Sequence, residues 1–456
     1  MASAASRGRG AYVGWLCECV KAIAALYLRR GKWPKLMTMN DDKQSRTDPF
    51  QLALADWQAG RSEAALAGLR AAVAGGDFGC ASLLLQLSSD PAAPDGAQAE
   101  AAETLLGAPD APLVRRHVAF LRARGYGLAA DPGAALTQRI DQARSGDAEA
   151  MTEVSLLSQL AGGDAAAATP LLETAAAAGS IAAIAALLRL GLEAGQLSPL
   201  ARQHTPVLSR AGHPLASNLI PAANALPVRP ATGQTSPAAR RPHWPEARDL
   251  LAALQAPAAN AEPLHDTPRI VRSPGFMPSV LCDYLATQAA PLLRPAQIFD
   301  AASGQTRPDP YRQSMTAALP DGVMDLVLWA IKLRMAALAG GTFDQGEPLA
   351  VLLYRPGEQY RPHVDYLTED GHAASADLAR RGQRIATSLV RLNQDFTGGE
   401  TMFPRLDIRW TGVRGDALGF ANTDAAGQGD PMTLHAGEPV SSGIKILASL
   451  WLRQRA

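Results

Sequence analysis

The stretch "YRPHVDYL", Tyr360–Leu367, places a histidine and an aspartate two residues apart among alternating apolar and polar positions. In a β-strand, side chains alternate between the two faces, so His363 and Asp365 would share one face and Val364 would take the other. One imidazole and one carboxylate on the same face can bind the same ion. A surface histidine and aspartate on an edge strand would give the same pattern, so the pair needs support from the surrounding chain.

The region around this stretch, from about Asp266 to the C-terminus, consists of short apolar runs broken by Gly, Pro, Asn and Asp. Two helices are expected in it, near 279–293 and 322–338. The pattern predicts an all-β sandwich, a jelly roll with supporting helices, over residues 266–456. The predicted strands are "LAVLLYRPG", "RIATSLVRLN", "DALGFAN" and "KILASLWLR".

A second histidine, His435, stands in "LHAGEPVSSGIKI", 70 residues after Asp365. Two histidines and one carboxylate form the facial triad of non-haem Fe(II) oxygenases, which leaves coordination positions open. Lys445 follows ten residues after His435, inside the apolar run "GIKILASLW". A lone ammonium there is costly unless it meets an anion, so we expect a buried carboxylate partner.

Four motifs in this region occur in the order typical of one enzyme family. They are "RQS" at 312–314, "YRPGEQYRPHVDY", "LNQDFTGGETMFP" and "HAGEPVSSGIK". With them the chain resembles the prolyl 4-hydroxylase branch of the 2-oxoglutarate- and Fe(II)-dependent dioxygenases, over about residues 266–455. The resemblance implies a double-stranded β-helix, which is the jelly roll of this family.

The resemblance also implies a role for individual residues. The Fe(II) ligands would be His363, Asp365 and His435, and Lys445 would pair with the distal carboxylate of 2-oxoglutarate. Tyr354 and Thr387 are further candidates for holding that carboxylate. The family's reaction uses Fe(II), 2-oxoglutarate and O2, and it releases succinate and CO2; whether L-ascorbate is also needed stays open.

The chain departs from the family pattern at two positions. Arg391 stands where the family usually has tyrosine, and Ile446 where it commonly has tryptophan. Arg391 shares a strand face with Thr387, so it is a cosubstrate-binding candidate that could add a second cationic contact or read an acidic group on the substrate. An edge-strand salt bridge is the alternative, and Arg384 is expected to be solvated.

The region 48–221 is rich in Ala and Leu at helical spacing, with glycines at the breaks. The turn glycines Gly146 and Gly179 lie 33 residues apart, as in two-helix solenoid repeats. The phrase "GYGLAADPGAALTQRIDQARSGDAEA" resembles Sel1-like repeats, relatives of the tetratricopeptide repeat. We therefore expect an all-α repeat solenoid here, with an Ala-rich bundle as the alternative, and a Pro/Ala-rich linker over 222–265.

Residues 1–47 are interpreted as an N-terminal extension that is either untranslated or disordered. Its apolar run is interrupted by Glu18 and Lys21, so no membrane span is expected. Three interpretations stay open: translation from Met37 or Met39 rather than Met1, an amphipathic surface helix, and an export signal.

Composition narrows the class of protein. Lys plus Arg equal Asp plus Glu at 43 each, so no basic field favours nucleic acid. The four cysteines form no C-x-x-C pair, which favours a reducing compartment and a cytoplasmic location.

The leading hypothesis is an Fe(II)/2-oxoglutarate dioxygenase that hydroxylates a prolyl or other residue of a protein or peptide, with the helical repeats recruiting that partner. Two alternatives stay open. One is a hydroxylase of a free amino acid or small metabolite, and the other is a repeat scaffold with an inactive oxygenase fold.

Overall fold

The computed structural model describes residues 48–90, 92–210, 213, 216–228, 244–256, 260–300, 305–308, 312–368 and 378–455. The hypotheses for 1–47 lie outside them, as does part of the expected linker. The chain divides into two compact units, and the boundary falls within helix α7 (Pro132–Arg144). The domain boundaries at 48, 222 and 266 stay a prediction.

The first unit is built from Ala- and Leu-rich helices around a continuous apolar core. It also contains residues 320–325, with the short helix η3 (Asp321–Val323). Arg116 Nη2 donates to Asp325 Oδ2 at 2.6 Å, and both side chains are buried. The helices are α2 (Pro49–Gln58), α3 (Ser62–Ala74), α4 (Gly79–Ser88), α5 (Ala97–Gly107) and α6 (Pro112–Arg124).

The second unit begins with helices joined by short turns. Gly146 and Gly179 end α7 and α9 at positive φ, where glycine is favoured, and Asp147 and Ser180 cap the next helices by accepting from Ala150 N and Ala183 N. Each of these two turns joins a pair of helices, and that the pairs are solenoid repeats stays a prediction. The helices are α8 (Ala148–Leu160), α9 (Ala165–Ala177), α10 (Ile181–Glu193), α11 (Pro199–Arg210), α12 (Ala216–Ala225) and α13 (Ala247–Gln255).

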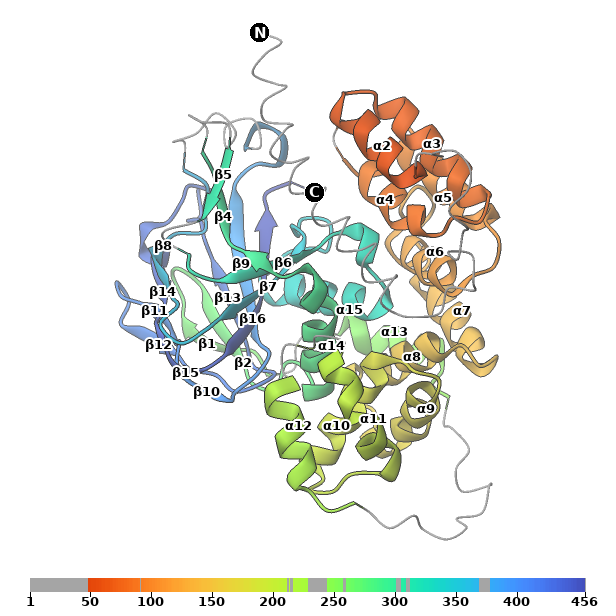
Figure 1. Ribbon diagram of the computed structural model, residues 1–456. Coiled ribbons are helices and arrows are strands. Elements are labelled where there is room, and N and C mark those ends of the chain that lie inside the picture. Colours follow the sequence, from red (N-terminus) through yellow and green to blue (C-terminus); the bar gives the residue numbers. More distant parts are fainter. Residues whose placement is uncertain are drawn as a thin grey trace. The chain divides into compact units, whose positions relative to one another are not determined.

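An ion pair and a hydrogen bond link these helices to the two helices that accompany the sheet in the same unit. Arg189 on α10 donates from Nε to Asp283 Oδ2 at 2.7 Å, and Asp283 lies on α14 (Ser279–Ala289). Arg334 on α15 (Leu326–Leu338) donates from Nη1 to the Leu160 carbonyl at the end of α8, at 2.7 Å. Helices α10 and α8 therefore pack directly on α14 and α15 (Figure 1).

The sheet region contains an eight-stranded antiparallel sheet, seen in Figure 1 with the central strands side by side. All four strands predicted from the apolar runs are present in it, as β7, β9, β13 and β16. In spatial order its strands are β1 (Glu262–His265), β2 (Ile270–Ser273), β13 (Ala417–Ala421), β9 (Arg384–Arg391), β16 (Lys445–Arg453), β7 (Leu349–Tyr354), β6 (Met315–Leu319) and β3 (Arg294–Pro295).

A four-stranded sheet faces the large one. Phe403 on the small sheet and Phe420 on the large sheet meet edge to face, with ring centroids 5.2 Å apart. Its order is β12 (Ile408–Trp410), β11 (Thr401–Phe403), β14 (His435–Gly437) and β8 (Tyr360–His363). Two two-stranded sheets pair β10 (Phe396–Gly398) with β15 (Val440–Gly443) and β4 (Gln297–Asp300) with β5 (Gln305–Pro308); single 3-10 turns are η2 (Ala290–Leu292) and η4 (Pro431–Thr433).

Strand β7 is buried at every position because the large sheet carries the apolar core on one face and helices on the other. Polar side chains on the inner face of these strands are therefore held away from water. Within the described parts of the chain, no helix combines the length and the apolar character that crossing a membrane requires.

Candidate active site

Three side chains that the sequence singled out come together at one end of the small sheet. Strands β8 and β14 pair so that His363 lies directly opposite His435. Asp365 lies in the bend just after β8, because the strand ends at His363 rather than continuing through Asp365 as expected. The bend still returns the carboxylate to the histidines, so the two-residue spacing predicted the neighbours correctly although the strand assignment at Asp365 was wrong.

The ligand atoms of this triad are close enough to share one ion. His363 Nε2 lies 3.6 Å from Asp365 Oδ1, and His435 Nε2 lies 3.7 Å from Asp365 Oδ2. One ligand atom from each of the three residues falls within 4.8 Å of the others. Among the described residues this is the one cluster of three or more such groups with that geometry.

Both imidazoles are oriented by main-chain carbonyls. Nδ1 of His363 lies 2.8 Å from the Arg361 carbonyl, and Nδ1 of His435 lies 3.0 Å from the Thr433 carbonyl. A ring that donates from Nδ1 keeps the Nε2 lone pair free for a metal. Burial, followed by the neighbouring His435, lowers the pKa of His363 to about 3, so this ring is neutral at physiological pH. The donor set therefore fits Fe(II).

The carboxylate ligand has its own support on β9. Thr387 Oγ1 donates to Asp365 Oδ2 at 2.7 Å, and Asn422 Nδ2 donates to Thr387 Oγ1 at 2.9 Å. Burial acts to raise the pKa of Asp365, but the two imidazoles and the Thr387 hydroxyl outweigh it and hold that pKa below its usual value. Thr387 thus lies against the metal-site carboxylate, and no described contact joins it to Lys445.

Lys445 begins β16 and lies opposite Tyr354 in the sheet register. Its side chain is 4 % exposed, and its ammonium lies 5.3 Å from the centroid of the Tyr354 ring. Within the described residues it forms no hydrogen bond or ion pair. Burial, followed by the charge of Arg391, lowers the pKa of Lys445 to about 7. A cation in this position favours a bound anion.

The "RQS" motif holds Tyr354 in place. The Tyr354 hydroxyl hydrogen-bonds with the side chains of Ser314 and Arg312, and burial raises its pKa. Arg312 also lies over the rings of Tyr360, at 5.4 Å, and Trp451, at 5.7 Å. This motif therefore connects the wall beside Lys445 to the aromatic residues near the triad.

Arg384 was expected to be solvated, but it forms an ion pair with Glu347. It donates from Nε and Nη2 to both oxygens of Glu347, at 2.7 and 2.8 Å, and its guanidinium lies 4.5 Å from the Trp451 ring centroid. Arg453 Nη1 donates to the same carboxylate at 3.1 Å. Burial acts to raise the pKa of Glu347, but the two guanidinium groups hold it below its usual value. Glu347 was not among the sequence candidates, since its partners lie on other strands.

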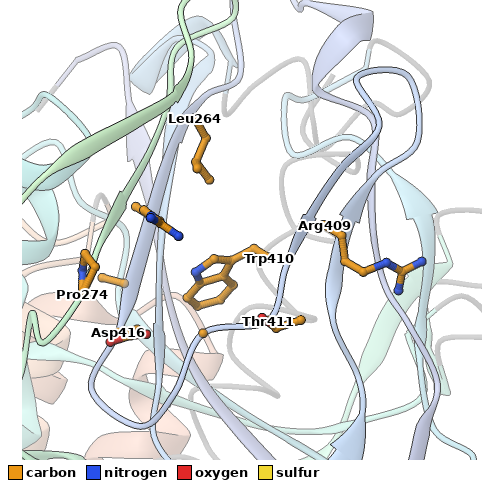
Figure 2. Close-up of a pocket in the computed structure, with 9 residues that line it drawn as sticks. Leu264, Pro274, Arg409, Trp410, Thr411 and Asp416 are labelled. Atoms are coloured by element: carbon orange, nitrogen blue, oxygen red, sulfur yellow. The ribbon is translucent and has the colours of Figure 1, made fainter.

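Arg391 lies at the end of β9, between β13 and β16, so the alternative of an edge-strand salt bridge was wrong. Its Nη1 donates to the Gly412 carbonyl at 2.7 Å, and its guanidinium lies 4.2 Å from the Phe396 ring centroid. The turn that contains Gly412 also lines a small cavity of about 110 Å³, where the Trp410 indole and the Asp416 carboxylate lie (Figure 2). No residue of the triad lines that cavity.

Comparisons with known proteins agree with this geometry. Residues 349–453 match the model of the 2OG-Fe(II) oxygenase superfamily. Prolyl 4-hydroxylase 1 of Arabidopsis thaliana is 32% identical over 204 residues, which are 42% of this chain and 70% of that protein. Prolyl 4-hydroxylase subunit alpha-1 of Rattus norvegicus is 34% identical over 197 residues, 43% of this chain but only 36% of the rat subunit.

A solved structure is also similar to part of this chain. It is a 2OG complex of the viral collagen prolyl hydroxylase vCPH from Paramecium Bursaria Chlorella virus-1, with 27% sequence identity and a TM-score of 0.31. The match covers 40% of this chain and 95% of that one. On the evidence of the superfamily match and the Arabidopsis relative, the chain belongs to the 2-oxoglutarate- and Fe(II)-dependent oxygenases, in their prolyl 4-hydroxylase-like branch, and is a dioxygenase that uses Fe(II), 2-oxoglutarate and O2.

Proposed function

We propose that this dioxygenase hydroxylates a prolyl or other residue of a protein or peptide and releases succinate and CO2. We further propose that its sheet region is a double-stranded β-helix, or jelly roll, and that residues 48–221 form a Sel1-like repeat solenoid. The names of the relatives, which are prolyl 4-hydroxylases and a collagen prolyl hydroxylase, support a peptide substrate.

One observation carries the proposal: Lys445, whose ammonium has no hydrogen bond or ion pair among the described residues, lies close to the metal ligands along β14. A side chain at Gly437 would begin 3.9 Å from Lys445 Nζ, so the ammonium lies beside Gly437. His435 and Gly437 share a face of β14 and are separated by about 7 Å along the strand. This spacing is comparable to the length of a five-carbon diacid that binds the metal at one end and Lys445 at the other.

Each residue of the site has a separate role in the proposed reaction. When bound, Fe(II) and 2-oxoglutarate activate O2 for the oxidative decarboxylation of 2-oxoglutarate and the insertion of one oxygen atom into a C–H bond. His363, Asp365 and His435 hold the metal, and Thr387 keeps the carboxylate in position. Lys445 neutralises the distal carboxylate.

The substrate would lie against the wall of rings and guanidinium groups beside the triad. The Tyr360 ring stacks on His363 with centroids 3.4 Å apart, and Trp451 lies between Arg312 and Arg384. Flat apolar rings suit the ring of a prolyl residue. The helical region would recruit the rest of the partner, as repeat surfaces commonly do.

The direct test is incubation of the purified protein with Fe(II), 2-oxoglutarate, O2 and a peptide library that includes proline-rich sequences. Mass spectrometry would detect added oxygen on peptides, and succinate would be measured in parallel. The proposal predicts that peptide hydroxylation and succinate formation both disappear in Asp365→Ala. Oxygen added only to free amino acids or small metabolites would favour that alternative, and failure to bind 2-oxoglutarate at all would favour an inactive scaffold.

A further inference from the structure

Arg391 and Lys445 lie close together on one face of the large sheet. Strands β9 and β16 pair with Leu447 opposite Arg391. Lys445 precedes Leu447 by two residues, so it shares the face of Arg391 and is its diagonal neighbour across the strands, at roughly 7 Å. The sheet register therefore brings two cations to the same end of the pocket.

Both side chains also border the same ring. The Arg391 guanidinium lies 4.2 Å from the centroid of Phe396. A Cβ built on Gly399 would stand 3.0 Å from Lys445 Cδ and 3.4 Å from Phe396 Cε2, so the lysine stem passes beside that ring. Because residue 399 is glycine, at a φ of +69°, the space between these groups stays open.

Among the residues that the structure describes, neither cation forms an ion pair, and the Arg391 guanidinium donates only to the Gly412 carbonyl. Arg391 is 8 % exposed, and its Nε is buried with no hydrogen-bond partner among the described residues. The acidic groups whose charges act on Arg391 are Glu400, which also acts on Lys445, and Asp416. Each has another partner: Glu400 lies 3.7 Å from Arg409, and Asp416 accepts from the main-chain N–H groups of Gly275 and Val413. Two buried positive charges that repel each other are stabilised when an anion lies between them.

We propose, on the basis of the proposed function, that the distal carboxylate of 2-oxoglutarate is held between Lys445 and Arg391, so that this chain binds its cosubstrate with two cations. Arg391 would contact the carboxylate through its free Nε–H while Nη1 stays on Gly412. The pocket would then discriminate strongly against 2-oxoacids that lack the distal carboxylate.

The test is calorimetric titration of the full-length protein loaded with Mn(II), which holds the site without turnover. Two ligands are compared: 2-oxoglutarate, and 2-oxopentanoate, which has the same carbon chain without the distal carboxylate. The variant is Arg391→Gln, which keeps a polar side chain about as long as the arginine up to Nε but carries no charge and does not reach Gly412. We expect 2-oxoglutarate to bind roughly 10- to 100-fold more weakly, the range for losing a charge-assisted hydrogen bond, with unchanged affinity for 2-oxopentanoate and Mn(II).

Unchanged 2-oxoglutarate affinity in Arg391→Gln would overturn the proposal and leave Arg391 as a support for the turn at Gly412. An equal loss for both ligands would overturn it too. If Arg391→Gln does not fold, the Lys445→Met variant is tested instead. With Arg391 still in place, we expect this variant to bind 2-oxoglutarate about tenfold more tightly than 2-oxopentanoate. Equal affinities for the two ligands would contradict the two-cation pocket. In this experiment the proposed function itself would fail if the unaltered protein bound both ligands alike.

Discussion

The helices of the second unit and its sheet core both bury charged side chains, but they treat them differently. In the helices, two buried arginines meet acidic partners: Arg139 donates to both oxygens of Glu153, at 3.0 and 2.7 Å, and Arg189 is paired with Asp283. In the sheet core Lys445 and Arg391 are equally buried, yet among the described residues neither has an acidic partner in contact.

This difference distinguishes buried charges that stabilise the fold from buried charges that bind a ligand. A buried ion pair compensates the desolvation of its two members, so it can persist without any function. A buried cation without a partner destabilises the protein by itself and is explained by an anion that binds there. The triad beside Lys445 would bind the metal ion, and the metal ion would bind the other end of that anion.

The largest effect is expected from the metal ligands. His363→Ala and His435→Ala should each abolish Fe(II) binding and succinate formation, because two remaining ligands do not hold a labile ion in this geometry. Asp365→Ala should also eliminate hydroxylation. Equilibrium dialysis with Fe(II) under anaerobic conditions and a succinate assay measure these losses. Near-normal turnover in either histidine variant would reject the triad assignment.

Breaking a buried pair in the helices should instead affect stability. Arg189→Met leaves Asp283 charged and buried without its partner, so we expect the free energy of unfolding to fall by about 3–5 kcal/mol. Denaturant unfolding followed by circular dichroism measures this. The matched control is Arg189→Met combined with Asp283→Leu, which removes both charges and should recover most of the loss. A single variant as stable as the unaltered protein would show that the pair does not support the packing of α10 on α14.

A smaller effect is expected from the residue behind the carboxylate ligand. Thr387→Val removes the hydroxyl that donates to Asp365 but keeps the shape of the side chain. Support of this kind typically contributes 10- to 100-fold in metal affinity or activity, so we expect Fe(II) affinity to fall by about that factor. Thr387→Ser keeps the hydroxyl and should retain most of the affinity. Equal behaviour of the two variants would mean that the hydrogen bond is unimportant.

The residues that the sequence identified are those marked by local spacing, by motifs or by a charge in an apolar run. Lys445 stands out because it interrupts an apolar strand, and His363 stands out through its two-residue spacing from Asp365. The four long strands were predicted from apolar runs broken by Gly, Pro, Asn and Asp. The family resemblance added the order of the motifs. These signals are local in the sequence, so they can be recognised without knowledge of the tertiary structure.

The features that were missed depend on which strands become neighbours. Asn422 reaches Thr387 only because β13 pairs with β9, and Glu347 meets Arg384 and Arg453 from three separate segments. Likewise, the strand around His363 was expected to include Asp365, but β8 pairs with β14 only as far as His363. No spacing within a single strand encodes such contacts.

The most direct test compares thermal unfolding of the unaltered protein and Lys445→Met, both loaded with Mn(II), with and without 2-oxoglutarate. At 100 times its Kd, the ligand should stabilise the unaltered protein by about 2.7 kcal/mol. At the same concentration a variant with 10- to 100-fold weaker binding should gain only roughly 0.4–1.4 kcal/mol. Without ligand the variant should be at least as stable as the unaltered protein, since it buries no unpaired charge. A variant that unfolds at a lower temperature without 2-oxoglutarate, yet keeps the full stabilisation by it, would contradict the account and make Lys445 a structural residue.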